Sequence, residues 1–295
     1  MRLRLDGIFL PLVTPFLDDG SLDLVSFEAN LDSYAGEDLA GCLVLGSTGE
    51  AASLEEEEKL TLVRAARRRA GDRILLVGTG LESTGATISL TRRVADLGAD
   101  AALVLTPHYY KSQMTLDVLR RHFEAVADAS PIPVLLYSVP QFTGLPFPTA
   151  LAASLAGHPK VVGMKESGGD VALLGRIAAA APPPFAVLCG SAPVLYPALC
   201  VGAAGGVLAV ACCAPRLVAA LYRAFEKGDH PGARRLQGIL TPLATAVSIH
   251  GIAGLKAAMD LGARRGGSVR APLLPVAVAL REELRPLLER AEAAV

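Results

Sequence analysis

The strongest constraint on the fold is a pattern repeated along most of the chain: a short apolar run, a turn containing Gly, Thr or Pro, and an amphipathic helical stretch. Strands that alternate with helices in this way form parallel sheets, whose strands are buried on both faces and therefore continuously apolar. The candidate strands are residues 7–13, 41–45, 73–77, 101–105, 133–137, 161–165, 186–188 and 206–210. Eight such units predict closure into a (β/α)8 barrel, the TIM-barrel architecture. The alternative is an open doubly wound sheet, which rarely contains eight regular repeats.

After the last candidate strand the pattern becomes purely helical, over residues 215–227, 231–248, 251–261 and 274–294. No Ser/Gly-rich linker separates these helices from the rest of the chain. We therefore predict a catalytic barrel over residues 1–225 and a small C-terminal helical extension, residues 226–295, packed on it.

Composition excludes several classes of function. Lys and Arg number 28 and Asp and Glu 29, giving a net charge of −1, so nothing indicates a nucleic-acid partner. Hydrophobic residues make up 52% of the chain, which is enough for a large core. The apolar runs are too short, or too interrupted by Gly, Pro or Cys, to span a membrane, and no signal peptide precedes the first strand. We expect a soluble, cytoplasmic protein.

The cysteines and histidines argue against a metal site. The cysteines form no CxxC pair and lie in apolar stretches, so we expect buried, reduced thiols. The five histidines are scattered without the spacing of metal ligands. We expect neither a metal nor a cofactor.

Lys165 is the most informative reactive residue. Catalytic side chains of such barrels lie at the carboxyl ends of the strands. Of six lysines only Lys165 ends an apolar strand, whereas Lys59, Lys111, Lys160, Lys227 and Lys256 have loop or helix-surface contexts. Loss of water in a barrel mouth favours the neutral amine, which attacks carbonyl groups. The alternative is a structural ion pair with Glu50 or Glu166.

Two further segments reach the same end of the barrel. Tyr137 ends the fifth candidate strand, where its phenol would lie near the amine and could move protons, although a lone tyrosine is more often a packing residue. The loop after the second strand reads Gly46-Ser47-Thr48-Gly49-Glu50. Glycines allow a tight turn whose N–H groups suit a carboxylate, but such loops are common.

In this order, the segments resemble the dihydrodipicolinate synthase / N-acetylneuraminate lyase family of class I pyruvate aldolases. The resemblance covers nearly the whole chain and rests on residues 46–50, Thr106-Pro107-His108-Tyr109-Tyr110, Tyr137-Ser138-Val139-Pro140 with Thr143-Gly144, and Gly163-Met164-Lys165-Glu166-Ser167. It implies a Schiff base between an enzyme lysine and a 2-oxo acid, pyruvate, without metal or cofactor.

The resemblance also implies a role for individual residues. Lys165 matches the Schiff-base lysine, and Tyr137 the tyrosine that relays protons and orients pyruvate. Ser47 and Thr48 match the pair that holds the pyruvate carboxylate, with Ser47 also in the proton relay. Tyr109 matches a tyrosine that reaches into a neighbouring subunit's site, which implies a dimer as the minimal unit and a homotetramer, a dimer of dimers, as the default.

The second substrate is predicted from departures within the family. Dihydrodipicolinate synthases place an arginine two residues after the proline of the YxVP motif, where this chain has Phe142. An aromatic ring cannot replace a bidentate clamp for a carboxylate. Lysine-inhibited members carry a tyrosine and histidines where this chain has His108, Glu56 and Lys59, so we do not expect lysine inhibition.

The segments around Tyr137 and Lys165 and three C-terminal motifs most resemble 4-hydroxy-2-oxoglutarate aldolase, which releases pyruvate and glyoxylate. Those motifs are Gly190-Ser191-Ala192, Gly251-Ile252-Ala253-Gly254-Leu255-Lys256 and Arg270-Ala271-Pro272-Leu273. That subfamily typically has asparagine where this chain has Thr48 and Phe142. Ser167, Gly190 and Leu208 are further candidate substrate contacts.

Three functions therefore remain open. The first is reversible cleavage of 4-hydroxy-2-oxoglutarate or a close 2-oxo acid. The second, with the same chemistry, is 4-hydroxy-tetrahydrodipicolinate synthesis from pyruvate and aspartate semialdehyde, or a pyruvate-dependent sugar-acid lyase or dehydratase. The third is a non-catalytic barrel that binds oxo acids, which the presence of Lys165, Tyr137, Tyr109 and Ser47 disfavours.

Overall fold

The computed structural model describes residues 3–181 and 183–295. Within these residues, eight parallel strands close into a barrel in sequence order, with β8 paired to β1. The predicted (β/α)8 fold is therefore confirmed. The strands are β1 (Gly7–Pro11), β2 (Gly41–Val44), β3 (Ile74–Gly78), β4 (Ala101–Leu105), β5 (Val134–Ser138), β6 (Val161–Glu166), β7 (Ala186–Cys189) and β8 (Gly205–Val207).

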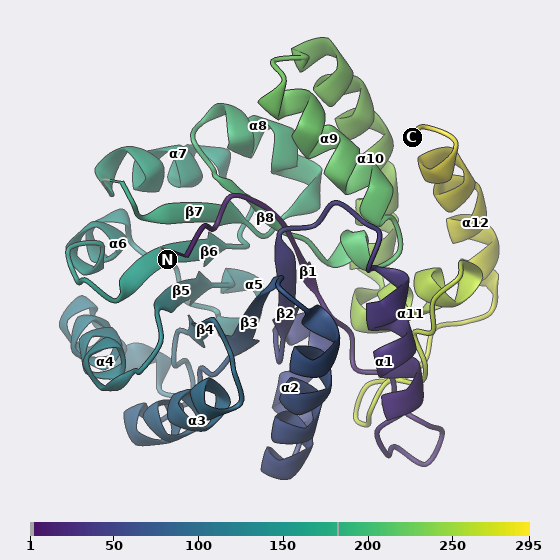
Figure 1. Ribbon diagram of the computed structural model, residues 1–295. Helices are drawn as coiled ribbons and strands as arrows, with labels where there is room; N and C mark the ends of the chain where they lie inside the picture. The colour runs from purple at the N-terminus through teal and green to yellow at the C-terminus, as the bar shows by residue number, and fades with distance from the viewer. Residues whose placement is uncertain (1–2, 182) are drawn as a thin grey trace.

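Helices surround the barrel, and Figure 1 shows α2, α3, α4, α6, α7, α8 and α9 following one another around the strands. The α-helices are α1 (Leu24–Ser33), α2 (Glu56–Ala70), α3 (Thr84–Asp96), α4 (Leu116–Ala129), α5 (Pro140–Thr143), α6 (Thr149–Leu155), α7 (Val171–Ala180), α8 (Leu195–Cys200), α9 (Pro215–Glu226), α10 (His230–Ile249), α11 (Gly251–Leu261) and α12 (Ala279–Glu292). Short 3-10 turns are η1 (Ser47–Gly49), η2 (Ala51–Ser53), η3 (Lys111–Gln113), η4 (Ala192–Val194) and η5 (Ala209–Cys212).

Alternate residues of each strand enter two separate hydrophobic clusters. Val134 and Leu136 of β5 belong to the large cluster that also contains the helix residues, whereas Leu135 and Tyr137 belong to a smaller one. Because successive strand residues point to opposite faces, the smaller cluster fills the barrel interior. Tyr137 is the last member of β5 on that inner face. The alternation therefore directs its side chain into the barrel mouth.

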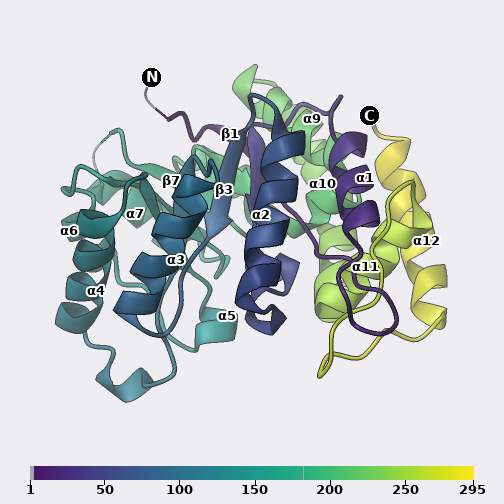
Figure 2. The ribbon, with the colours of Figure 1, turned by 60° about the horizontal axis from the view of Figure 1, so that its bottom comes forward.

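The C-terminal helices form an extension on one side of the barrel. Helix α10 packs against α9, α11 and α12, and Figures 1 and 2 both show α11 and α12 beside α1. The predicted boundary between residues 225 and 226 lies at the last residue of α9. The division into a catalytic barrel and an extension at that point stays a prediction.

Several predicted boundaries differ from the structure. The eighth run was expected to extend to residue 210, but β8 ends at Val207 and η5 follows, because Ala211 N–H bonds back to Leu208 O at 3.0 Å. A short apolar run does not distinguish a strand from a buried helical turn. The last helix begins at Ala279 rather than at residue 274. Pro275 accounts for this, since the residue before a proline disfavours helical backbone.

The cysteines are only partly as expected. Cys42, Cys189 and Cys212 are buried, but Cys213 is intermediate and Cys200, at the end of α8, is exposed. The apolar sequence around Cys200 did not reveal that it ends a helix on the outer surface. Among the described helices, none is long and apolar enough to cross a membrane.

Candidate active site

Lys165 and Tyr137 meet in the mouth of the barrel. They lie opposite each other in the β5–β6 register, and both are 5% exposed. Lys165 Nζ lies 4.4 Å from the centre of the Tyr137 ring. Neighbouring parallel strands end at the same edge, so two inward residues in register must come together there. The prediction that both residues reach one place is confirmed by this geometry.

The alternative of a structural ion pair for Lys165 is wrong. Within residues 3–181 and 183–295, no carboxylate lies within 4.0 Å of its Nζ. Glu50 is instead paired with Lys256 at 2.6 Å. Glu166 accepts hydrogen bonds from the N–H groups of Gly168 at 2.7 Å and Gly169 at 3.3 Å, and burial raises the pKa of its carboxyl group. A buried amine without a carboxylate partner is suited to attack a carbonyl carbon.

The loop after β2 brings Ser47 to the same place. Ser47 Oγ lies 3.3 Å from the hydroxyl oxygen of Tyr137, within hydrogen-bonding distance. Thr48 follows on the same turn, η1, and is half-buried. Gly49 is required because a Cβ atom there would lie 2.9 Å from the backbone oxygen of Leu12. Phenol, serine hydroxyl and amine thus form one group that can move protons to and from a bound carbonyl oxygen.

A cavity of about 550 Å³ opens onto this group. Ser47 and Tyr137 line its inner part, and Phe142, 61% exposed, lines its mouth. Among the described residues that line it, Lys59 is the sole lysine or arginine, and burial lowers the pKa of that amine. Lys165 is not among these lining residues and reaches the cavity through its contact with Tyr137.

Ser167 and Gly190 lie together at the ends of β6 and β7. The Ser167 hydroxyl is buried and has no hydrogen-bond partner among the described residues. A Cβ atom at Gly190 would lie 1.9 Å from Ser167 Oγ, so only glycine leaves room for this side chain. Gln141 of α5 donates a hydrogen bond to Ser167 O at 3.2 Å. The backbone at Ser167 is therefore fixed, while its buried hydroxyl has no hydrogen-bond partner in the described part of the chain.

Two predicted site residues do not join this group. Leu208 is fully buried in the large core cluster and does not line the cavity. Tyr109 is 75% exposed and packs edge-on against Tyr110, with ring centres 5.1 Å apart. Its backbone N–H donates to Glu82 at 2.8 Å. The roles of Leu208 and Tyr109 stay predictions.

The sequence analysis missed the buried position of Lys256. This residue was assigned a helix-surface context, but its side chain is 2% exposed and bound to Glu50. A signal was present, because Lys256 lies between Leu255 and Ala257 in a helix that is apolar for most of its length. Which face of such a helix is covered depends on packing against the barrel, and the sequence does not show that.

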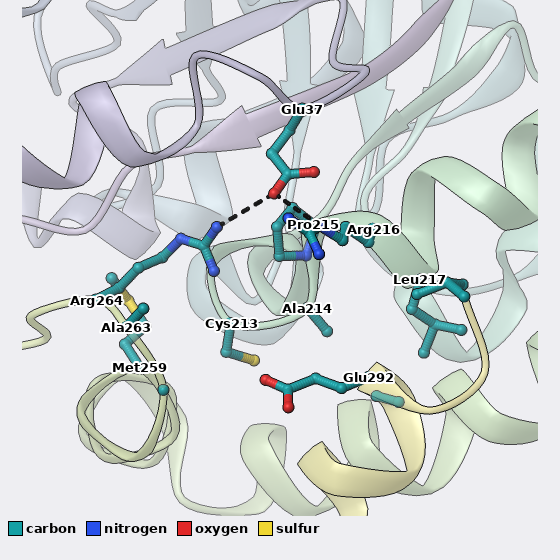
Figure 3. Close-up of a pocket in the computed structure, with 13 residues that line it drawn as sticks. Glu37, Cys213, Ala214, Pro215, Arg216, Leu217, Met259, Ala263, Arg264 and Glu292 are labelled. Atoms are coloured by element: carbon teal, nitrogen blue, oxygen red, sulfur yellow. Dashed lines mark hydrogen bonds and ion pairs between the residues drawn. The ribbon is translucent and has the colours of Figure 1, made fainter.

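A second cavity, of about 350 Å³, lies between the C-terminal helices and the barrel (Figure 3). Glu37, Arg264 and Arg216 line it, and Figure 3 shows both arginines directed at the Glu37 carboxylate. None of its lining residues ends a barrel strand. The chemistry therefore belongs to the first cavity. In the part of the chain that the structure describes, no group of three or more His, Cys, Asp or Glu residues is arranged to hold a metal ion.

Comparison with known proteins places these features in a family. Residues 4–291 match the model of the dihydrodipicolinate synthetase family. A 4-hydroxy-tetrahydrodipicolinate synthase of Exiguobacterium sibiricum is 37% identical, over 92% of this chain and 91% of the relative. The corresponding protein of Methanoculleus marisnigri is 36% identical, over 96% of this chain and 98% of the relative.

Solved structures agree with the family assignment. The chain is similar to the dihydrodipicolinate synthase of Acinetobacter baumannii complexed with pyruvate, with 31% identity, a TM-score of 0.92 and coverage of 98% and 99%. The E. coli K12 prophage protein YagE, also in complex with pyruvate, gives 29% identity and a TM-score of 0.92 over 98% and 99% of the two chains. A structure described as the first monomeric dihydrodipicolinate synthase variant gives 29% identity and a TM-score of 0.90 over 98% and 97%.

The names of these relatives bear on the second substrate. The prediction of a pyruvate aldolase family is confirmed. The curated relatives reported above, however, are called 4-hydroxy-tetrahydrodipicolinate synthase rather than 4-hydroxy-2-oxoglutarate aldolase. Their names support the alternative given from the sequence more than the first choice.

Proposed function

Because this chain belongs to the dihydrodipicolinate synthetase family, whose members are pyruvate-dependent lyases and synthases that form Schiff bases, we propose that Lys165 is its Schiff-base lysine. The observation that carries the proposal is the environment of its Nζ. The amine is buried at a strand end, lies over the Tyr137 ring and has no carboxylate partner among the described residues. An amine placed in this way can approach the carbonyl carbon of a bound 2-oxo acid without being held by an anion.

The proposed reaction uses the three groups in sequence. The Lys165 amine adds to C2 of the 2-oxo acid, and the carbinolamine loses water to give an iminium ion. In cleavage, a base removes the proton of the C4 hydroxyl, the C3–C4 bond breaks, and its electrons pass into the iminium to give an enamine. Protonation at C3 and hydrolysis release pyruvate. Tyr137 and Ser47, whose oxygens are 3.3 Å apart, are proposed to carry these protons.

Borohydride reduction tests the covalent step. Reduction in the presence of pyruvate should attach a pyruvyl group to one peptide, the one containing Lys165, because this amine lies beside Tyr137 and has no carboxylate within 4.0 Å in the described part of the chain. Lys256 is an internal control, since it is equally buried but held by Glu50. Peptide mass mapping gives the result. Label on Lys256, or an active protein without label on Lys165, would contradict the proposal.

For the second substrate, the cavity favours 4-hydroxy-2-oxoglutarate, which yields pyruvate and glyoxylate. The glyoxylate carboxylate is bonded directly to the aldehyde carbon, so it must be bound close to Lys165. The buried hydroxyl of Ser167, two residues further along, is free of partners in the described structure. The aspartate semialdehyde carboxylate lies further from its aldehyde and needs a cation nearer the mouth, where Phe142 presents an apolar ring.

The second candidate is 4-hydroxy-tetrahydrodipicolinate synthesis, and the names of the relatives favour it. Within the cavity, Lys59 is the cation that could attract the aspartate semialdehyde carboxylate. A lysine binds as a point charge, however, and does not reproduce the planar two-bond contact of an arginine.

Substrate comparison with Phe142→Arg separates the two candidates. For the unmodified protein we expect faster cleavage of 4-hydroxy-2-oxoglutarate than condensation of aspartate semialdehyde with pyruvate. A hydrogen bond to a charged group contributes about 1.5–3 kcal/mol, so Phe142→Arg should raise kcat/KM for aspartate semialdehyde about tenfold. Phe142→Gln, which is polar but uncharged, is the matched control. Faster turnover of aspartate semialdehyde by the unmodified protein would establish the second candidate instead.

We further propose that the active form is an oligomer, with a homotetramer as the default. The description of one similar structure as a first monomeric variant supports an oligomer as the ordinary state of these relatives. The exposure of Tyr109 and Tyr110 supports a covered surface at this edge of the barrel. The cytoplasmic location inferred from composition stays a prediction.

A further inference from the structure

A buried ion pair between Glu50 and Lys256 holds the loop that carries Ser47 and Thr48. Glu50 ends this loop with left-handed backbone, at φ 53°. Its Oε1 lies 2.6 Å from Lys256 Nζ, and the two side chains are 1% and 2% exposed. Burial lowers the pKa of Lys256, while the hydrogen bond with Glu50 opposes that change. The loop thus ends on a charge that is fixed in one place.

Lys256 also holds the loop indirectly, through Thr14. Its Nζ donates to Thr14 O at 2.8 Å and to Ser268 O at 2.7 Å. Thr14 Oγ1 in turn donates to Gly49 O at 2.7 Å. One ammonium group of α11 therefore fixes both the side chain of Glu50 and the backbone at Gly49. Two hydrogen bonds and one ion pair therefore fix the position of the ammonium group.

Arg270 completes this contact from the segment between α11 and α12. Its backbone N–H donates to Glu50 Oε2 at 2.9 Å. Its guanidinium forms two hydrogen bonds with Glu58, at 2.6 and 2.7 Å, and donates to Ser53 O at 2.8 Å. It also lies over the Phe16 ring, 4.2 Å from its centre, while Lys256 Nζ lies 4.7 Å from the same centre. The planar fork of arginine fits this two-bond contact.

From this arrangement we infer that Lys256 and Arg270 are positioning residues, which hold the 46–50 loop so that Ser47 and Thr48 meet the carboxylate of the bound 2-oxo acid. The inference rests on the function proposed above. Lys256 acts through the Glu50 side chain. Arg270 acts on Glu50 with its backbone N–H, and its side chain holds Ser53, whose own N–H donates to Glu50 O at 2.8 Å. The C-terminal extension therefore supports the active site, because its residues hold the loop after β2 although they lie more than 200 positions further along the chain.

Arg264 provides a matched control within the same extension. It also follows α11, pairs with a barrel glutamate, Glu37, at 3.6 Å, and lies over an aromatic ring, 4.4 Å from the centre of Tyr34. The two arginine side chains have similar exposure, 14% for Arg264 and 17% for Arg270. Arg264 lines the second cavity (Figure 3) and makes no contact with the 46–50 loop. Its removal also takes a half-buried arginine from the extension, but without the proposed effect on the loop; because Arg264 makes fewer hydrogen bonds than Arg270, the stability of each variant is measured beside its activity.

The test compares Arg270→Gln with Arg264→Gln by borohydride trapping of pyruvate on Lys165. For Arg270→Gln, the pyruvate concentration for half-maximal labelling should rise about tenfold to about a hundredfold, as for displacement of a binding group by roughly 1 Å. The KM for the 2-oxo acid should rise with it and kcat should change less, because the loop binds the carboxylate in both ground and transition states. Arg264→Gln should leave both constants unchanged. The melting temperature of each variant measures how much stability the substitution removes.

Two further variants make the test decisive. The double variant Glu50→Gln/Lys256→Met leaves no uncompensated buried charge. It should also raise the pyruvate concentration for half-maximal labelling. Arg270→Lys keeps the positive charge but loses the planar guanidinium, so it should raise this pyruvate concentration by an intermediate amount. If Arg270→Gln does not fold, Arg270→Lys is compared with Arg264→Lys instead. Equal effects of the Arg264 and Arg270 variants, or an unchanged double variant, would overturn the inference. Absence of label on Lys165 in the unmodified protein would instead contradict the proposed function.

Discussion

At the scale of single residues, two buried lysines of this chain have opposite environments. Lys256 is held by a carboxylate and two backbone carbonyl oxygens. Lys165 has an aromatic ring beside it and no carboxylate within 4.0 Å in the described part of the chain. Such a difference separates a structural cation, which is held by fixed partners, from an amine that is left available to attack a carbonyl carbon. Sequence position identified Lys165 correctly as the strand-end lysine but misplaced Lys256.

Tyr137→Phe isolates the proposed proton transfer at this scale. The variant keeps the ring beside Lys165 Nζ and loses the hydroxyl that lies 3.3 Å from Ser47 Oγ. We expect kcat to fall by about 10²–10⁴, the usual contribution of a positioned acid or base, with a smaller change in KM. Steady-state kinetics gives both constants. Ser47→Ala should show a smaller loss of kcat, and a Tyr137→Phe variant as active as the unmodified protein would exclude the phenol from the relay.

At the scale of elements, the helices are fixed to one another by a few buried polar contacts. On α4, His122 has its Nδ1 2.9 Å from Thr84 Oγ1 of α3. Its ring is 6% exposed, and burial lowers the pKa of His122 to about 4 from its usual 6.5. The folded protein therefore keeps this imidazole neutral at pH values where the unfolded chain is already protonated. The α3–α4 contact is thus sensitive to acid.

The pH dependence of stability follows from the difference between the pKa values of His122 in the folded and the unfolded protein. Between the usual pKa of 6.5 and about 4, the unfolded chain binds more protons at His122 than the folded one, so the free energy of unfolding falls as the pH decreases through this window. Each unit of difference corresponds to about 1.4 kcal/mol. Urea unfolding at about pH 7 and about pH 5 should show a smaller decrease for His122→Gln than for the unmodified protein. Equal decreases would mean that other groups cause the acid sensitivity.

At the scale of the whole molecule, the surface near the active site carries two exposed aromatic side chains. Tyr109 is 75% and Tyr110 64% exposed, on the segment that follows β4. Large aromatic side chains that gather at a surface generally mark an interface. The proposal that Tyr109 serves the neighbouring subunit explains why its side chain is exposed and does not line the cavity of its own chain.

Complementation between inactive variants tests this division of the site. Tyr109→Phe and Lys165→Ala should each be nearly inactive alone. After mixing and reassembly, about a quarter of all sites should be intact, because half of randomly formed dimers are mixed and each mixed dimer has one complete set. Activity of the mixture measures the recovery, and native mass spectrometry shows whether mixed oligomers form. Mixed oligomers without recovered activity would mean that Tyr109 serves its own chain.

The sequence by itself determined the barrel and the place of its reactive lysine. Eight continuous apolar runs alternating with helices leave few other folds, and the end of an apolar strand is a position that can be read from the chain. The same local patterns supported Tyr137 and Ser47, since parallel strands all end at one edge. These inferences depend on short segments and on rules that hold for every parallel barrel.

Only the tertiary structure decided which charges meet. Glu50 and Lys256 are separated by more than 200 residues, and either could have paired with another charged group until the extension packed on the barrel. The free hydroxyl of Ser167 likewise depends on the missing side chain at Gly190, one strand away. Pairing of buried charges and room for a side chain are properties of three-dimensional contacts, which local periodicity does not encode.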